Sequence, residues 1–340
     1  MKFFQRLLVA PAALGLMAPV AVNADTAFSS TTTLSGSAVF TVGSVSDGGT
    51  SDTEEELYMQ YAYGLDINSS FTGEDTFYAG IEAGNASGPL ASMDSAVEGG
   101  DSLTVANLFY AFPVGDLEVT VGPLVAQDEV LAATTSAYSG SFRLGAMPFS
   151  EAGDETGPGV GFAYSADNGI VASVSYVSVG GTDSSQGIAG EGDDVATFTF
   201  GYDSPSSGFG GGMVVATNDG EETTSTNGHD SLGVGVYYSP ESIPATVSVA
   251  FDSRDPQAGN DSTDWFVGID YEAGPGTLSL AYNTTDVEGG TADDQVGMEI
   301  SYSYAVNDHL TITPGFFSVE ETTAGQSDDK GVYLETVFSF

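Results

Sequence analysis

The 340-residue sequence contains no cysteine, only five basic residues, two histidines and one tryptophan. The absence of cysteine excludes a disulfide scaffold and any site built on thiolates. The only histidines, His229 and His309, offer neither a multi-histidine metal site nor a histidine-based triad. No serine lies in a nucleophile-elbow context beside a suitable base. We therefore expect no enzyme, no cofactor and no bound metal.

Positive charge is scarce, whereas 48 residues are acidic, so the formal net charge is -43. Lys2 and Arg6 lie near the N-terminus, which leaves Arg143, Arg254 and Lys330 as the basic residues of the remaining chain. Such a chain repels phosphates, so we expect no nucleic-acid partner, and it attracts cations. Adaptation to a salty habitat is an alternative cause of the charge. Disorder is disfavoured by the 41% hydrophobic and 11% aromatic content.

Long apolar runs are confined to the N-terminus. Residues 1–24 combine a positive start, an apolar stretch over 7–22 and a small-residue cleavage site, as in a secretory signal peptide. A membrane-anchoring helix is the alternative, but Pro11 and Pro19 interrupt the stretch. No later stretch approaches about 18 apolar residues, so we expect no helical membrane span. The sequence thus predicts a signal peptide over 1–24 and one domain over 25–340.

The remaining chain has the two-residue periodicity of β-strands. In residues 331–340, for example, Val332 and Leu334 alternate with Tyr333 and Glu335. About sixteen such segments fit the length, which predicts an all-β fold, a transmembrane antiparallel β-barrel. The strands are expected to begin near residues 35, 57, 76, 104, 117, 159, 169, 194, 208, 231, 245, 262, 276, 294, 309 and 331.

The connections between these segments alternate between two kinds. The short, turn-like connections are 113–116, 165–169, 204–208, 272–276 and 305–309. The long connections, rich in glycine and acidic residues, are 86–101, 180–193, 218–230, 254–261, 285–293 and 320–330. Outer-membrane barrels have short periplasmic turns and longer outer loops, whereas a soluble sandwich has no reason to sort its loops by end.

Aromatic residues gather at both ends of the expected strands. Those that precede short turns are Phe112, Tyr164, Tyr202, Tyr238, Tyr271 and Tyr304. Those near the long loops are Trp265, Tyr176, Tyr282 and Phe316. Aromatics favour strands in general, but that preference does not predict clustering at strand ends. Two aromatic girdles around an apolar band are typical of a membrane barrel.

Acidic side chains within strands fall on the face opposite the apolar one. We expect them to line a water-filled pore, the candidates being Asp66, Glu82, Glu118, Asp252, Asp270, Glu299 and Glu335. A charge facing lipid would be costly, so this sorting is what a membrane requires. A polar interior predicts a channel.

The connection over residues 122–158 differs from the others because it is far longer and mixes apolar with charged residues. Its apolar side chains need burial, so we expect it to fold into the barrel and narrow the pore. The candidate constriction residues are Asp128, Glu129, Arg143, Glu151, Asp154 and Glu155. The alternative is an ordinary surface excursion or one more hairpin.

Three stretches after the leader carry a family resemblance. Residues 28–40 (FSSTTTLSGSAVF), 81–85 (IEAGN) and 108–123 (LFYAFPVGDLEVTVGP) resemble the barrel domain of cyanobacterial outer-membrane porins, which are grouped with carbohydrate-selective porins. The leader, with LLVAPAALGL over 7–16, is similar as well. The resemblance implies a trimeric pore for small solutes, including inorganic ions such as iron. The family usually carries a surface-layer-homology domain between signal and barrel, and here the first expected strand follows the cleavage site within about ten residues, so the resemblance does not extend to peptidoglycan anchoring or to the family's specificity.

Together these patterns predict an outer-membrane porin that passes small hydrophilic solutes by diffusion, with a preference for cations. A carbohydrate-selective porin is one alternative. A secreted, acidic, β-rich surface or adhesion protein is another, from a different class. The expected partners are outer-membrane lipid, the ions or solutes in transit, and two further copies of the chain.

Overall fold

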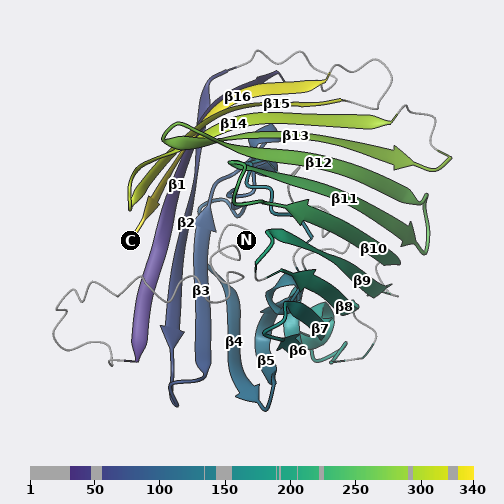
Figure 1. Ribbon diagram of the computed structural model, residues 1–340. Coiled ribbons are helices and arrows are strands. Elements are labelled where there is room, and N and C mark those ends of the chain that lie inside the picture. Colours follow the sequence, from purple (N-terminus) through teal and green to yellow (C-terminus); the bar gives the residue numbers. More distant parts are fainter. Residues whose placement is uncertain are drawn as a thin grey trace.

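The computed structural model describes residues 31–46, 56–133, 135–142, 155–188, 190, 193–204, 206–221, 226–289, 294–320 and 328–340. Within these ranges, sixteen antiparallel strands close into one barrel (Figure 1), in which each strand pairs with its sequence neighbours and β1 pairs with β16. Closure leaves no strand edge open, so the backbone hydrogen bonds of the wall are made within the wall. The predicted signal peptide, residues 1–24, lies outside the described residues.

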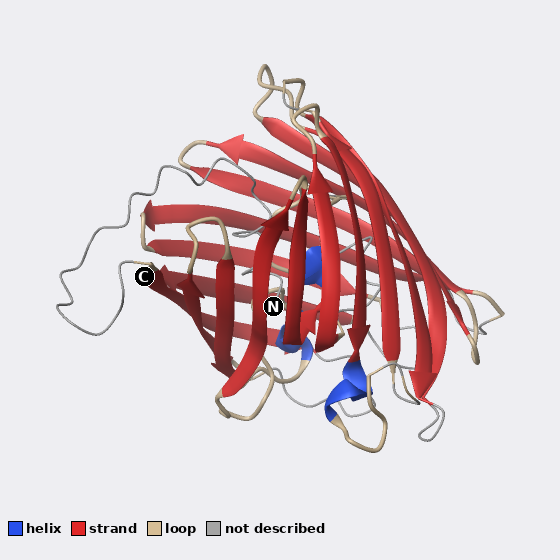
Figure 2. Ribbon diagram, turned by 90° about the horizontal axis from the view of Figure 1, so that it is seen from below, coloured by secondary structure: helices blue, strands red, loops and turns tan. Residues whose placement is uncertain are grey.

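The wall is made of strands of nine to fifteen residues. They are β1 (Thr32–Ser46), β2 (Tyr58–Ser69), β3 (Thr76–Gly84), β4 (Thr104–Val114), β5 (Leu117–Ala126), β6 (Thr156–Ser165), β7 (Ile170–Ser178), β8 (Asp194–Asp203), β9 (Phe209–Glu221), β10 (Thr226–Tyr238), β11 (Ala245–Pro256), β12 (Ser262–Ala273), β13 (Gly276–Val287), β14 (Gln295–Asn307), β15 (Leu310–Val319) and β16 (Asp329–Ser339). Short 3₁₀ helices are η1 (Pro89–Ser92), η2 (Gln127–Val130) and η4 (Val179–Thr182). Figure 2, which views the barrel from below, shows short helical segments inside the ring of strands and at its rim. No helix in the described ranges is long and apolar enough to cross a membrane.

The two faces of the wall have opposite chemistry. On β14, Met298 and Ile300 are 46% and 43% exposed, whereas Glu299 between them is 3% exposed. Successive strand residues point to opposite faces, so the exposed apolar side chains form the outer surface and the polar ones face inward. This arrangement suits hydrocarbon outside and water inside. It excludes the packed sandwich of a secreted adhesion protein.

Eight of the ten predicted girdle aromatics are exposed on the outer face, whereas Phe112 and Tyr176 are half-buried. At the short-turn end, the outward aromatics include Tyr164, Tyr202, Tyr238, Tyr271 and Tyr304, all exposed. Near the long-loop end, Trp265, Tyr282 and Phe316 are exposed as well. Their rings can therefore reach the headgroup levels on both sides of the membrane.

The predicted strand starts agree with the structure to within three residues, except at β10. That strand begins at Thr226, not near residue 231, and His229 pairs with Asn218 of β9. Much of the expected 218–230 loop is therefore hairpin. Because a hairpin can rise above the membrane into water, its polar residues are compatible with a strand. The polarity of residues 218–230 therefore predicted the wrong start for β10.

One long connection was wrongly expected to lie outside. Within residues 85–103, Leu90 and Met93 are fully buried and Val97 is nearly so. The segment folds inward because these three side chains need apolar partners, which the lumen supplies.

Candidate functional site: the lumen and its inner belt

The described first half of the connection between β5 and β6, up to Phe142, follows the inside of the wall. Its residue Gln127 donates from Nε2 to Thr197 Oγ1 of β8, at 2.8 Å. Further along, the backbone N–H of Ala132 donates to Ser173 Oγ of β7 at 3.1 Å, and that of Ala137 donates to Ser248 Oγ of β11 at 3.0 Å. Residues 127–133 and 135–142 thus lie on the lumen side of the wall and contact β7, β8 and β11. The prediction that this connection folds inward is confirmed for these residues.

Glu299 of β14 fixes the far end of this connection. Its Oε1 accepts hydrogen bonds from the backbone N–H of Phe142 at 2.8 Å and from the Tyr333 hydroxyl at 3.0 Å. Its Oε2 accepts from the Tyr138 hydroxyl at 3.2 Å. Burial and the charges of Glu299 and Asp270 raise the pKa of Tyr138, so that hydroxyl remains a donor. A carboxylate only accepts hydrogen bonds, which suits these three donors.

Two more wall carboxylates bind the same connection. Asp270 of β12 accepts from the backbone N–H of Ser139 at 2.9 Å and from Ser279 Oγ at 2.6 Å. Glu335 of β16 accepts from Ser141 Oγ at 3.4 Å. Both carboxylates are buried. They therefore serve as hydrogen-bond acceptors for the loop as well as charges facing the lumen.

The inward part of the β3–β4 connection continues the same path. Ser95 Oγ donates to Glu335 Oε2, and the backbone N–H of Asp94 donates to the Ser141 carbonyl oxygen at 2.9 Å. On the other side, Gln60 Nε2 of β2 donates to the Leu90 carbonyl oxygen at 2.9 Å. We call the described residues of 89–97 and 127–142 the inner belt, because together they follow the wall from β7 through β16 to β2.

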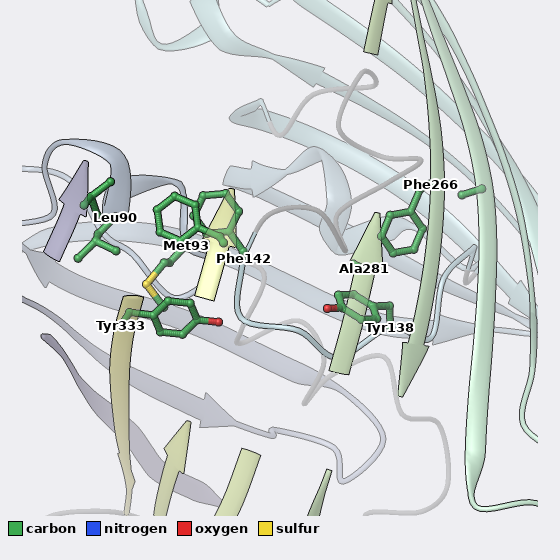
Figure 3. Packing of buried hydrophobic residues seen from close by; sticks show 10 residues of the cluster. Leu90, Met93, Tyr138, Phe142, Phe266, Ala281 and Tyr333 are labelled. Atoms are coloured by element: carbon green, nitrogen blue, oxygen red, sulfur yellow. The ribbon is translucent and has the colours of Figure 1, made fainter. Parts of the chain in front are cut away.

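A small apolar cluster joins the two parts of the inner belt (Figure 3). Met93 and Phe142 pair as an antiparallel bridge, and Phe142 stacks on Phe317 of β15 with ring centroids 4.2 Å apart. Leu90 and Tyr333 complete the contact. Burying a large apolar side chain contributes roughly 1.5–3 kcal/mol, so this cluster is a substantial part of what holds the belt.

Glycines in the wall let the belt lie flat against it. A Cβ added at Gly268 of β12 would lie 2.6 Å from Tyr138 Cδ2. At Gly161 of β6, an added Cβ would overlap the side chain of Val130. These strand glycines, which weaken a strand in other settings, here allow a backbone to approach closely.

An acidic corner lies where the inner belt begins. Glu129 of η2 lines a small pocket with Asp66, Glu82 and Tyr78, and the Tyr78 hydroxyl donates to Asp66 Oδ1 at 2.5 Å. Burial first, and then the charges of Asp128 and Asp66, raises the pKa of Glu129 to about 8. Glu129 is therefore mostly protonated at neutral pH, and its charge depends on pH there.

The structure separates the predicted constriction residues into two groups. Asp128 is buried and Glu129 half-buried in η2, while the Glu155 carbonyl oxygen accepts from the Gln127 backbone N–H at 2.7 Å. Arg143, Glu151 and Asp154 lie outside the described residues.

The predicted pore-lining residues lie on the inner face. Those that are buried there are Asp252, Asp270, Glu299 and Glu335, and those that are half-buried are Asp66 and Glu82. Glu118 is exposed near the short-turn end of β5. Sequence reasoning missed Asp94 and Ser95. The signal that could have found them is the set of apolar residues nearby, the same signal that marked residues 122–158.

Below the junction of the two belt parts lies a cavity of about 330 Å³. Its eleven lining residues come from both belt parts and from β14, β15 and β16, and they include two carboxylates, Asp94 and Glu335, and seven hydroxyl groups. Ser303, Thr311 and Ser339 line it toward the short-turn end. The cavity lining thus combines hydroxyl and carboxylate acceptors with apolar surface.

A closed barrel with an apolar outer wall, two aromatic girdles, a polar inside and an inward-folded loop defines an outer-membrane pore protein. Residues 10–337 match the Gram-negative porin family, and the chain belongs to that family. It is an outer-membrane porin. The family and the fold indicate a channel rather than an enzyme.

Solved porin structures have the same fold at low sequence identity. OprB of Pseudomonas putida has a TM-score of 0.69 at 11% identity, over 91% of this chain and 94% of that chain. A loop-deletion mutant of OmpT from Vibrio cholerae has 0.65 at 14%, over 91% and 99%. An anion-selective porin from Comamonas acidovorans has 0.63 at 14%, also over 91% and 99%. No curated protein matches the sequence. At these identities the likeness carries the fold alone.

Proposed function

We propose that this porin passes small hydrophilic solutes by passive diffusion and prefers cations. The observation that carries the proposal is the imbalance of charge on the inner face. The described strand carboxylates that face inward and are half-buried or buried include Asp66, Glu82, Asp252, Asp264, Asp270, Glu299 and Glu335. Arg254 of β11 is the one arginine among the described strand residues, and its Nη2 lies 3.2 Å from His229 Nδ1.

Fixed carboxylates raise the local concentration of cations and lower that of anions. Within a narrow, low-dielectric passage this field decides which ion enters. The effect should weaken with added salt, because the Debye length falls from ~10 Å at 0.1 M to ~3 Å at 1 M. Further acidic residues lie in the long connections of the sequence and contribute to the chain's net charge of -43. They support the same sign of selectivity.

The proposed constriction is the passage left beside the inner belt. Asp128, Glu129 and Glu155 contribute at its start, and Arg143, Glu151 and Asp154 are proposed to complete it. The contacts that hold residues 127–142 against the wall support this proposal, since a loop fixed inside a barrel narrows it.

Carbohydrate selectivity, which the resemblance to cyanobacterial porins implies, has less support. Sugar sites use aromatic platforms, and none of the eleven residues that line the lumen cavity is aromatic. The cyanobacterial relationship itself stays a prediction from residues 1–125. Iron as a transported ion also stays a prediction.

The proposed assembly is a homotrimer. OmpT of Vibrio cholerae, whose fold is similar, is described in a trimer form at a TM-score of 0.63. The mass of the native, unboiled protein in detergent, measured by light scattering, tests this proposal. A monomer would contradict it.

Reversal potentials across a planar bilayer test the cation preference. With a tenfold KCl gradient, the proposal expects a potential of the sign set by potassium, larger in dilute salt. A potential of the sign set by chloride would overturn it. Liposome swelling with sugars of graded size measures the carbohydrate alternative in the same preparation.

A further inference from the structure

Three side-chain oxygen atoms are buried at the long-loop ends of the neighbouring strands β6, β7 and β8 (Figure 1). They are Thr156 Oγ1, Ser178 Oγ and Asp194 Oδ1, and within the described part of the chain none of them has a hydrogen-bond partner. Ser178 is 0% exposed and Asp194 is 8% exposed, whereas Thr156 is half-buried. Most buried polar atoms in proteins are paired, so three unpaired oxygens on adjacent strands require an explanation.

These side chains lie on the outer side of the wall and not in the lumen. Residues two apart on a strand share a face, and Ser178 shares its face with the exposed residue Val174. Asp194 likewise shares its face with the exposed residue Phe198, and the same spacing places Thr156 on the outer face of β6. Ser178 and Asp194 are also register partners, so their Cβ atoms are expected about 4.5–5.5 Å apart.

The short helix η4 covers this part of the wall. It follows β7 directly and contacts β6 and β8. A Cβ added at Gly181 would lie 2.9 Å from Ser178 Oγ, so this hydroxyl points toward η4. The backbone N–H of Val179 donates to the Asp193 carbonyl oxygen at 2.7 Å, which joins η4 to the start of β8. Outward positions that would otherwise meet water are therefore enclosed.

The charge of Asp194 has no positive partner among the described lysine and arginine side chains. Lys330 forms an ion pair on another strand, and Arg254 lies on the inner side of β11. A second carboxylate lies nearby instead, because the Asp194 backbone N–H donates to Asp219 Oδ1 at 2.8 Å. Burial of an unpaired charge is costly, and buried charges in proteins are paired or coordinate metals.

The oxygen atoms at this site favour a hard divalent cation as the partner. Ca²⁺ binds carboxylate, carbonyl and water oxygens at ~2.3–2.6 Å, whereas a water molecule would satisfy the hydroxyls and leave the charge unpaired. The described residues contain no group of three acidic or histidine side chains placed to hold a metal, so carbonyl oxygens and water would supply the remaining ligands. The expectation from the sequence of no bound metal rested on histidine and cysteine, which hard cations do not need.

We propose that Thr156, Ser178 and Asp194 belong to a binding site for a divalent cation of the calcium type at the outer rim of the barrel, with Asp194 as the charged ligand. The ion connects η4 to three strands, so its binding stabilises this part of the rim. Because the site has few carboxylates, its affinity falls in the weak range of about 10⁻⁴–10⁻³ M. The site lies outside the lumen and does not rest on the proposed function.

Urea unfolding of the full-length, folded protein in detergent tests the proposal with calcium as the probe. The exposed acidic residues attract cations without specificity, so the control is KCl added to equal ionic strength. We expect calcium to raise the urea midpoint with a saturable dependence on concentration, and KCl not to reproduce the rise. A rise of the same size with KCl would overturn the proposal.

Two variants with opposite expectations separate this site from the general acidity of the rim. Asp194→Asn should weaken the apparent calcium affinity by about tenfold or more, because the charged ligand is lost. In the presence of a chelator the same variant should be at least as stable as the wild type, because a buried unpaired charge is gone. Asp286→Asn, which changes an exposed acid at the long-loop end of β13, is the matched control and should keep the full calcium response.

Ser178→Ala keeps every charge and should weaken the calcium affinity by a smaller factor than Asp194→Asn. An unchanged calcium response in Asp194→Asn would overturn the proposal, and so would a loss of stability in the chelator, which would make this carboxylate a purely structural group. If Asp194→Asn does not show the unboiled migration of a folded barrel, Ser178→Ala decides, and an unchanged affinity in that variant overturns the proposal.

Discussion

Met93 and Phe142 are paired across two connections that belong to different strands of the barrel. Their antiparallel bridge is the one described point at which the two belt parts meet as backbone partners, beside the hydrogen bond from Asp94 N–H to the Ser141 carbonyl. Both side chains are buried in the same apolar cluster. The inner belt is therefore one connected unit, and a change at the junction should affect both of its parts.

The junction can be tested by a cross-link, because the chain contains no cysteine. The double variant Met93→Cys/Phe142→Cys should form a disulfide on mild oxidation, since bridge partners lie within the range that a disulfide spans. The product should migrate differently on a non-reducing denaturing gel. Met93→Cys/Ser173→Cys is the control, because Ser173 contacts a different stretch of the belt. Cross-linking of the control pair, but not of the first, would contradict the junction.

Removal of the Glu299 carboxylate should loosen the belt. Glu299→Ala leaves the donors of Phe142, Tyr138 and Tyr333 without their acceptor, at a cost of about 1–3 kcal/mol for each buried donor left unpaired. Glu299→Gln keeps one acceptor oxygen and should show a smaller effect. We expect larger and noisier single-channel conductance and a lower urea midpoint in the order wild type, glutamine, alanine. Equal conductance in all three would mean that Glu299 does not position the belt.

The charge of Glu129 should appear as pH rises through about 8. Its pKa in the folded protein lies above the ordinary value of 4.5, so the folded state holds the proton more tightly than the unfolded state. The contribution of this group to stability is thus full at low pH and decreases as pH rises from about 4.5 through about 8. Within the pore, the added negative charge should increase cation selectivity between about pH 7 and pH 9.

This titration is measured by reversal potentials across the pH range, with Glu129→Gln as the comparison. The variant should lack the rise near pH 8, while its selectivity at pH 6 stays close to that of the wild type. A rise of the same size in the variant would assign the titration to another group.

The outer wall can be tested at two adjacent positions of β14. Ile300→Lys places a charge on the lipid-facing side and should destabilise the barrel by about 2–4 kcal/mol if it lies near the membrane midplane. Ser301→Lys points inward, where water is available, and should cost much less. Urea unfolding from lipid bilayers compares the two. A larger loss for the lumen variant would reverse the assignment of faces.

The fold was predictable because the signals for it are repeated around the barrel. The strands share one pattern of alternation, and successive pairs of strands are joined by short turns, so an error in the start of β10 does not change the predicted fold. The strand acids on β12, β14 and β16 were assigned to the inner face on this basis, and Asp270, Glu299 and Glu335 lie there.

The inner belt was predictable only in part, because its contacts join residues that are distant in sequence. Apolar residues in 122–158 indicated an inward fold, yet nothing in their spacing identifies Glu299 as the acceptor for Phe142. Asp94 and Ser95 were overlooked because their connection was classed as acidic and rich in glycine. The apolar residues Leu90 and Met93, which indicate an inward fold, were not weighed against that composition. Local composition describes a loop's solubility, whereas its position depends on the wall it meets.

The pairing of β1 with β16 has a consequence for how the protein is made. Ala38 lies opposite Phe338 and Thr41 opposite Glu335, so the seam joins the first and last strands. Until the last strand pairs with the first, the sheet has two open edges that can pair with other chains. Contacts between such distant parts of a chain form slowly. Export of this polypeptide should therefore require chaperones that cover both edge strands until the barrel closes in the membrane.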